Sequence, residues 1–169
     1  AGTAAAGVFM STDSGGSWSA SNVGLTSSNV TALAAFQPGS PPGVPPVLPF
    51  VYAGTADAGV FVSSNHGATW APVNTSLTNL HVAALAIDAS SGTVFAATQG
   101  GVFRFDGTGS WVSVSNGLTN TNIAALAIDP SNPQVLFAGS FATLFKTSNG
   151  GTNWSPVFTS GADRVASIA

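Results

Sequence analysis

The sequence predicts an all-β protein built from repeated four-stranded sheets, and three observations support this. One eight-residue segment recurs four times, and its copies contain all four tryptophans. These box segments read STDSGGSW (11–18), SSNHGATW (63–70), RFDGTGSW (104–111) and TSNGGTNW (147–154). A second segment, VTALAA at 30–35, returns as VAALAI at 82–87 and IAALAI at 123–128. Short runs rich in Val, Phe, Thr and Gly at a period of about 42 residues are typical of repeated small sheets.

The elements can be placed in order in the second repeat. Strand A is expected over 30–36, strand B over 50–55, strand C over 59–64 and strand D over 69–74. The box segment is then the turn between strands C and D. Four antiparallel strands at this period describe one blade of a β-propeller. A helical solenoid of similar period would need amphipathic helices of about ten residues, which period-2 runs argue against.

We expect one propeller region over 1–169, and the repeat spacing sets its subdivisions. The blade parts are 1–29, 30–81, 82–122 and 123–164, and 165–169 starts a further strand. The long second repeat contains a Pro-rich insertion at 37–50, which holds six of the ten prolines and should be a loop dispensable for folding. The ends of the chain could pair to close a four-bladed ring, or the chain could be the middle of a longer ring. We favour the longer ring.

The residue types of the box segments suit a tight turn. A short Asp or Asn side chain accepts hydrogen bonds from nearby backbone N–H groups, and Gly supplies a backbone conformation that other residues resist. The tryptophan should fold back over its own C–D hairpin, burying roughly 150–250 Å². In the third copy the glycines move to 107 and 109, so its turn should differ. The residues given this structural role are Asp13, Gly15, Trp18, Asn65, Gly67, Trp70, Asp106, Trp111, Asn149, Gly151 and Trp154.

Composition excludes several classes of function. Charged residues make up 5% of the chain, with six Asp, no Glu and three Lys plus Arg, and the net charge is −3. This gives no basic surface for nucleic acid. The chain has no Cys for a disulfide framework or a thiolate metal site, and no apolar run long enough to span a membrane. Surfaces made polar by Ser, Thr and Asn suit an extracellular or cell-surface protein.

The pattern Ser/Thr-x-Asp-x-Gly-x-x-Trp resembles the Asp-box, or bacterial neuraminidase repeat. This repeat occurs in sialidases, xyloglucanase-type glycoside hydrolases, sortilin-type receptors and secreted bacterial propellers. The resemblance covers nearly the whole chain apart from the insertion. It implies a β-propeller in which the boxes are structural and lie on the face opposite the usual active site.

The chain lacks the catalytic groups that the resemblance would require. A sialidase needs three Arg, a Tyr nucleophile and a Glu, whereas this chain has Arg104, Arg164, Tyr52 and no Glu. Xyloglucanase-type enzymes use two Asp, and only Asp57 and Asp163 lie outside boxes and turns. We therefore assign no catalytic residue. His66 and His81 occupy different structural positions without a Cys or Glu partner, so we assign no metal and no cofactor.

Candidate ligand-binding residues lie on the face opposite the boxes. Four of them precede the A strands, and two belong to B–C loops. They are Asn29, His81, Asn122, Arg164, Asp57 and Gln99. Varied polar residues over a repeated scaffold are how such a face would bind a ligand. The alternative is that they are ordinary solvated loop residues.

The function expected from the sequence is a secreted or cell-surface, non-catalytic propeller that binds a polysaccharide or a surface protein. One alternative is a segment of a propeller glycoside hydrolase whose catalytic carboxylates lie outside this chain. A second alternative is a structural component of an extracellular assembly. Further blades, or another chain, are the partners expected at the open ends.

Overall fold

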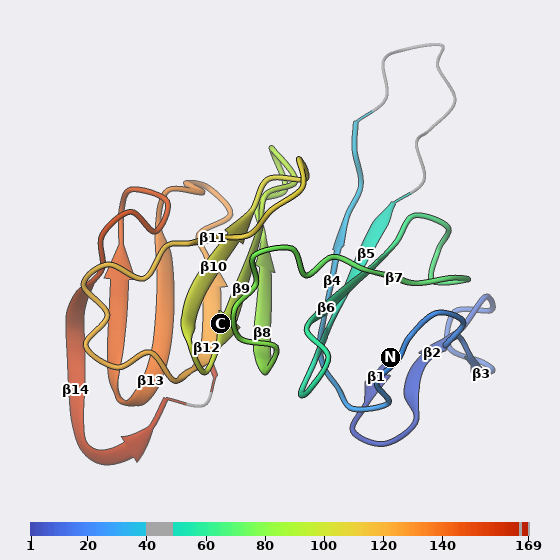
Figure 1. Cartoon of the computed structure of the whole chain (residues 1–169), viewed down its shortest axis with the longest axis horizontal. Helices are drawn as coiled ribbons and strands as arrows, with labels where there is room; N and C mark the ends of the chain where they lie inside the picture. The colour runs from blue at the N-terminus through green and yellow to red at the C-terminus, as the bar shows by residue number, and fades with distance from the viewer. Residues whose placement is uncertain (40–48, 166, 169) are drawn as a thin grey trace.

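The computed structural model describes residues 1–39, 49–165 and 167–168, and in this part the predicted all-β class is confirmed. Strands β1 to β14 form four antiparallel sheets that follow one another across the molecule (Figure 1). We call these sheets blades 1 to 4. The described residues contain no helix long and apolar enough to cross a membrane. Most of the predicted insertion, residues 40–48, lies outside the described residues.

The first three blades follow the predicted order of strands. Blade 1 contains β1 (Gly2–Thr3), β2 (Gly7–Met10) and β3 (Ser19–Ala20). Blade 2 contains β4 (Val30–Phe36), β5 (Phe50–Thr55), β6 (Val60–Ser63) and β7 (Ala71–Pro72). Blade 3 contains β8 (Val82–Ile87), β9 (Val94–Thr98), β10 (Gly101–Phe105) and β11 (Val112–Ser113). Strand D in blade 2 is shorter than the predicted 69–74, and it starts later because the N–H of Trp70 bonds to blade 1 instead of to its own sheet.

Blade 4 departs from the other three blades in its outer half. It contains β12 (Ile123–Ile128), β13 (Leu136–Thr147) and β14 (Ser155–Arg164). β13 takes the place of both strand B and strand C, since its first half pairs with β12 and its second half pairs with β14. β14 continues for ten residues, whereas the outer strands of the other blades have two.

The hydrophobic cores lie at the seams, by which we mean the contacts between neighbouring blades. Strand A of each blade packs on strand B of the blade before it. A Cβ built on Gly54 of β5 would lie 2.6 Å from Cγ1 of Val82 in β8, so only glycine allows this approach. Val165 lies against Gly139 in the same way and donates its N–H to the carbonyl of Ser140 (3.2 Å).

The predicted start of a further strand at 165–169 is only partly described. β1 has β2 as its ladder partner, and no ladder in the described part of the chain joins β1 to residues 165, 167 or 168. Residues 166 and 169 lie outside the described residues. The blade number of the intact protein stays a prediction.

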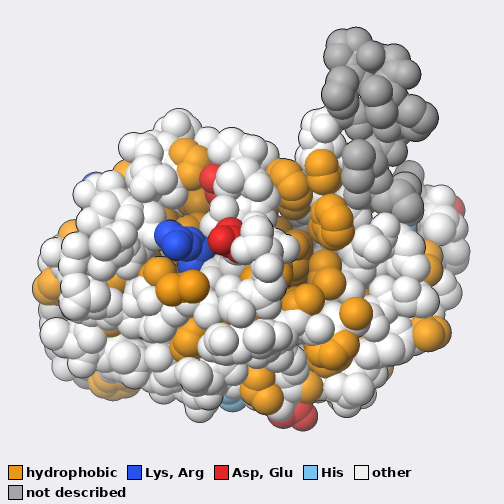
Figure 2. Space-filling model, turned by 45° about the horizontal axis from the view of Figure 1, so that its top comes forward, with side chains coloured by type: hydrophobic (Ala, Val, Ile, Leu, Met, Phe, Trp, Pro, Cys, Tyr) orange, Lys and Arg blue, Asp and Glu red, His pale blue; other side chains and the backbone are white. Residues whose placement is uncertain are grey.

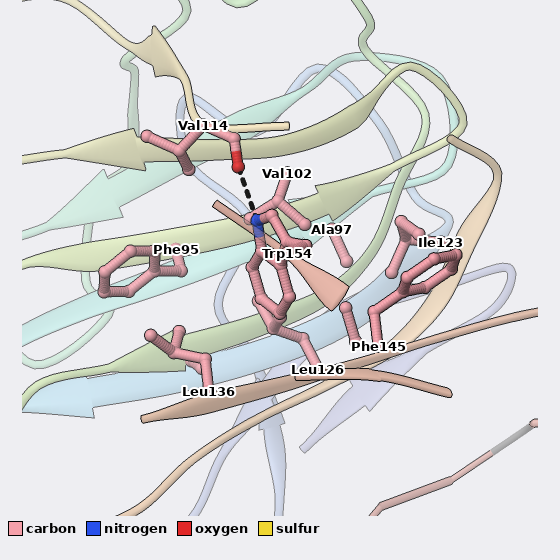
Figure 3. Close-up of a cluster of buried hydrophobic side chains, with 11 residues drawn as sticks. Phe95, Ala97, Val102, Val114, Ile123, Leu126, Leu136, Phe145 and Trp154 are labelled. Atoms are coloured by element: carbon pink, nitrogen blue, oxygen red, sulfur yellow. Dashed lines mark hydrogen bonds between the residues drawn. The ribbon is translucent and has the colours of Figure 1, made fainter. Parts of the chain in front are cut away.

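The tryptophan rings of blades 2 to 4 lie between blades, so the expectation that each ring packs on its own hairpin holds only in part. Trp111 does stack on Phe105 of its own strand C, with ring centroids 5.2 Å apart. Each of three rings donates its Nε1–H to the last strand region of the preceding blade. The bonds run from Trp70 to the Ser21 carbonyl (2.8 Å), from Trp111 to that of Val73 (2.5 Å) and from Trp154 to that of Val114 (2.7 Å). Figure 3 shows the Trp154 ring between side chains of blades 3 and 4. These three rings are only 2–5% exposed.

The backbone beside each ring explains a second repeated motif, Gly-Leu-Thr at 24–26 and 117–119 and Ser-Leu-Thr at 76–78. The N–H of Trp70 bonds to the carbonyl of Val23 (2.8 Å), which brings the Trp70 carbonyl against Gly24. A Cβ on Gly24 would lie 2.1 Å from that oxygen, and φ at Gly24 is +87°. The leucine that follows packs against the buried ring. The motif therefore packs against the tryptophan of the next blade.

Trp18 is the exception, and the expectation that it is buried is wrong. Its side chain is 53% exposed, although its box segment matches the others. Its indole N–H has no acceptor among the described residues. The difference is one of surroundings, since no outer strand of another blade covers this ring in the part of the chain that the structure describes.

Substituting the tryptophans should separate the buried rings from the exposed one. Trp70→Ala, Trp111→Ala and Trp154→Ala should each lower the free energy of unfolding by about 3–5 kcal/mol, as large-to-small core changes do. Trp18→Ala should change it by less than about 0.5 kcal/mol, as expected for an exposed side chain. Denaturant unfolding followed by circular dichroism measures both values. Equal losses at Trp18 and Trp70 would show that the contact between blades is not what stabilises the rings.

Candidate functional site

Three of the four box segments form the same turn through side-chain hydrogen bonds. The hydroxyl of the first residue accepts the N–H of the fifth, as in Ser11 and Gly15 (2.8 Å) or Ser63 and Gly67 (2.8 Å). The Asp or Asn oxygen accepts the N–H of the seventh residue, as Asp13 does from Ser17 (2.8 Å). Box segment 147–154 has both bonds, at 3.2 and 2.9 Å. These side chains are thus engaged in holding turns.

The third box segment forms a different turn. Asp106 accepts from the N–H of Thr108 (2.9 Å) and from its hydroxyl (2.5 Å). Gly107 and Gly109 have positive φ, at +86° and +137°.

On the face opposite the boxes, the structure links only some of the predicted ligand residues. The Ser27 hydroxyl donates to Asp57 (2.5 Å) and accepts the N–H of Asn29 (3.2 Å), which joins blades 1 and 2. The backbone N–H groups of His81 and Asn122 bond within their own loops, to Asn79 and Asn120.

The side chains of His81 and Gln99, two further predicted ligand residues, make no such link with the described residues. Nδ1 of His81 is buried and has no hydrogen-bond partner among the described residues. Gln99 is exposed in the turn after β9, and Arg164 ends β14 with its side chain outside the described atoms.

The box face, by contrast, carries a pocket at each seam. Strand C contributes the equivalent residue to all three pockets: Met10 between blades 1 and 2, Val62 between blades 2 and 3, and Arg104 between blades 3 and 4. Their volumes are about 220, 380 and 290 Å³. Figure 2 shows basic and acidic side chains together in a hollow, with hydrophobic side chains beside them. The seam geometry repeats, and the chemistry changes with the strand C residue.

Sequence reasoning missed the pocket around Arg104, because it considered this arginine only as part of a sialidase clamp. The remaining walls are mostly polar and include Asp88, Asp106, Gln134 and Asn149. Aligning the C strands would have revealed the signal, since Arg104 stands where the two preceding blades have Met10 and Val62.

Of the charged groups in this pocket, the two carboxylates accept hydrogen bonds and the guanidinium group of Arg104 donates none to the described residues. The guanidinium group makes no hydrogen bond or ion pair with any residue that the structure describes. Hydrogen bonds from Thr108, aided by the charge of Arg104, lower the pKa of Asp106. Partial burial raises the pKa of Asp88, but hydrogen bonds from Ser90 and Ser91 outweigh it and bring the pKa below its usual value. Both carboxylates are therefore ionised at neutral pH, beside an unpaired cation.

The pocket and the opposite face offer little for a metal ion. In the part of the chain that the structure describes, no three His or Asp side chains gather closely enough to hold one. The pocket around Arg104 can donate and accept hydrogen bonds, which suits binding of a polar molecule.

Comparisons with known proteins identify the fold. No family model and no curated protein matches the chain. A GH74 enzyme from Niastella koreensis has a TM-score of 0.75 and 20% identity over 94% of this chain and 27% of its own. A GH74 xyloglucanase from Xanthomonas campestris has a TM-score of 0.67 and 23% identity over 93% of this chain and 27% of its own. YCF48 bound to D1 peptide has a TM-score of 0.60 and 18% identity over 89% of this chain and 47% of its own.

These comparisons show the fold. The neighbours are β-propeller proteins, and the chain spans about a quarter of the length of the GH74 enzymes and about half of YCF48. The architecture is therefore part of a β-propeller.

Acid should weaken the fold through the box turn of Asp13. Hydrogen bonds from Ser17 and Ser11 lower the pKa of Asp13 from its ordinary 3.8 to about 2. Because the folded-state pKa is the lower one, this carboxylate stabilises the fold fully above about pH 4 and loses its contribution as pH falls toward 2. In Asp13→Asn the amide oxygen can still accept the N–H of Ser17, as the amides of Asn65 and Asn149 do in their own turns. The substituted side chain no longer titrates.

The melting temperature of Asp13→Asn, measured by circular dichroism across this pH range, should therefore fall less steeply than that of the native chain. At neutral pH it should exceed that of Asp13→Ala, which lacks the acceptor. Identical acid dependence in Asp13→Asn and the native chain would contradict the role of this carboxylate.

Proposed function

We propose that this chain is part of a secreted or cell-surface β-propeller of the Asp-box type, which binds a glycan or a surface protein without catalysing a reaction. The observation that carries the proposal is the distribution of the six Asp side chains. Four of them accept hydrogen bonds in turns on the box face: Asp13, Asp88, Asp106 and Asp129. Asp57 and Asp163 belong to blades 2 and 4, and blade 3 stands between them.

A glycosidase needs two carboxylates across one substrate, one of them protonated. Asp88 and Asp106 do share a pocket, but the pKa of each is lowered, so neither is a proton donor at neutral pH. Asp57 is held by the Ser27 hydroxyl. These features support a binding role for the described residues.

The likeness to GH74 enzymes supports one alternative, in which the chain is a segment of a propeller hydrolase with its catalytic carboxylates elsewhere. A scaffold of this kind hosts more than one activity, so the fold does not decide between the two. Few charges and many Ser, Thr and Asn side chains favour a location outside the cell or on its surface.

Binding and hydrolysis can be measured on the same samples. The purified chain, incubated with insoluble cellulose, mannan, xylan and chitin and with immobilised xyloglucan, should be retained by at least one polysaccharide and release no reducing sugar. Denatured chain is the control for non-specific retention. Release of reducing sugar by the chain itself would overturn the non-catalytic assignment, and retention on none of them would leave the protein-binding form to be tested on cell-surface extracts.

A structural role is favoured by a specific observation at blade 1. The three covered tryptophans each bond to the residue that follows an outer strand, shortly before Gly-Leu-Thr or Ser-Leu-Thr. Among the described residues, no such segment covers Trp18. We call the exposed surface around the Trp18 ring the Trp18 face. We propose that the outer strand and Gly-Leu-Thr segment of another blade pack against it. β14 is a poor match for this role, since Ser160-Gly161-Ala162 stands where the others have the motif.

Two peptides from this chain test the Trp18 face. The peptide 112–121, which contains Gly117-Leu118-Thr119, should bind at millimolar concentration and protect Trp18 from quenching by acrylamide. The peptide 155–164, which lacks the motif, should not. Neither peptide contains tryptophan, so the signal comes from the protein, and Trp18→Ala is the matched control. Equal protection by both peptides, or by neither, would show that the face does not recognise this strand.

A further inference from the structure

We propose that the two box-face pockets at the seams of blades 2 and 3 and of blades 3 and 4 together bind a neutral oligosaccharide. The inference deepens the proposed binding function and rests on it. It places the ligand on the face opposite the loop residues that the sequence suggested.

The two pockets are neighbours with a common wall. Ser91 and Asp106 line both of them. Each pocket, at about 290 and 380 Å³, is close to the lower end of the roughly 300–1,000 Å³ typical of small-molecule sites. A ligand filling both would therefore be extended along the face, with one unit at each seam.

The charges of the first pocket favour a neutral polyol. Two carboxylates and one guanidinium line it, so an anion would meet a net negative charge. Hydroxyl groups of neighbouring residues hold both carboxylates in place, and Arg104 offsets one of the two negative charges, so little net charge is left to attract a cationic ligand. Arg104 offers donors that no described residue uses, and Gln134 can both donate and accept. Oδ1 of Asn149 already accepts bonds from Thr147 and from the N–H of Asn153, so Asn149 offers its amide N–H groups as donors. Adjacent hydroxyl groups, which donate and accept at fixed spacing, match this set.

The second pocket supplies the apolar contact that a sugar ring also needs. Four of its ten lining residues are aromatic, namely Phe36, Phe50, Tyr52 and Phe105. Phe36 and Phe50 are partly exposed, while Tyr52 and Phe105 are buried beneath. An apolar pocket with a few convergent polar groups at one side is the common form of a small-molecule site. A chain of pyranose rings has both hydroxyl groups and apolar ring faces. The hydroxyl groups would suit the first pocket and a ring face would suit the second.

The repeat itself supplies substitutions that the fold should accept. Arg104→Val places in blade 3 the residue that blade 2 has at the equivalent position, and Phe50→Thr places in blade 2 the residue of blade 3 at 93. Lys146→Val is the matched control, because Lys146 is the equivalent residue of blade 4 and lines neither pocket.

The test is titration of the chain with neutral gluco-, manno- and galacto-oligosaccharides, monitored by calorimetry and by amide chemical shifts. An oligogalacturonate and an acidic peptide serve as charged comparators. At least one neutral oligosaccharide should bind and shift amides of 88–93 and 104–108. Arg104→Val should weaken its affinity by about tenfold or more, the worth of a charge-assisted hydrogen bond. Phe50→Thr should also weaken it, and Lys146→Val should leave it unchanged.

The outcomes separate this inference from the proposed function. Binding that shifts amides near Asn29, His81 and Asn122 and survives Arg104→Val would overturn the box-face site and keep the binding function. Preference for the oligogalacturonate or the peptide would overturn the neutral ligand class. No binding of any oligosaccharide by the folded native chain would overturn the inference outright, whether or not a protein partner is found. Circular dichroism of each variant confirms that a lost signal is not lost folding.

Discussion

The rest of the structure depends on the hydrogen bond from a tryptophan ring to the outer strand of the preceding blade. A small sheet whose outer strand has two residues must bury its apolar face against a neighbouring sheet. The ring closes each seam by filling the space between two sheets and by satisfying a carbonyl at its edge. Because the three described seams use the same contact, the leucine beside the ring recurs with it, preceded by a glycine or, at Ser76, by a serine of positive φ. Few charges are then needed to hold the molecule together.

The repeated seam also creates a place for variation. Strand C brings one residue to the same point of each seam, and the three residues differ in kind: Met10, Val62 and Arg104. The scaffold can thus change the chemistry of a pocket without changing its position. Blade 4 shows the limit of this regularity, since its long β14 lacks the segment that receives a tryptophan. The GH74 enzymes and YCF48 share the scaffold at low identity, which agrees with a fold whose function lies in substitutable side chains.

The sequence determined the strand order, the blade repeat and the residues of the box turns. All of these depend on contacts close in the chain, and the hydrogen bonds of Asp13, Asn65 and Asn149 span four residues or fewer. The carbonyl groups that accept the indole N–H bonds could not be predicted from local sequence. The bonds of Trp70, Trp111 and Trp154 join residues 38 to 49 positions apart.

Only the tertiary structure decided what surrounds each repeat. Trp18 and Trp70 end equivalent box segments, yet one is exposed and the other is buried, since among the described residues another blade covers Trp70 and none covers Trp18. The pocket around Arg104 likewise has walls from two blades, and the sequence of either blade alone does not contain it. A local pattern fixes a turn because its partners are neighbours in the chain, whereas a ring or a pocket at a seam depends on how two sheets pack.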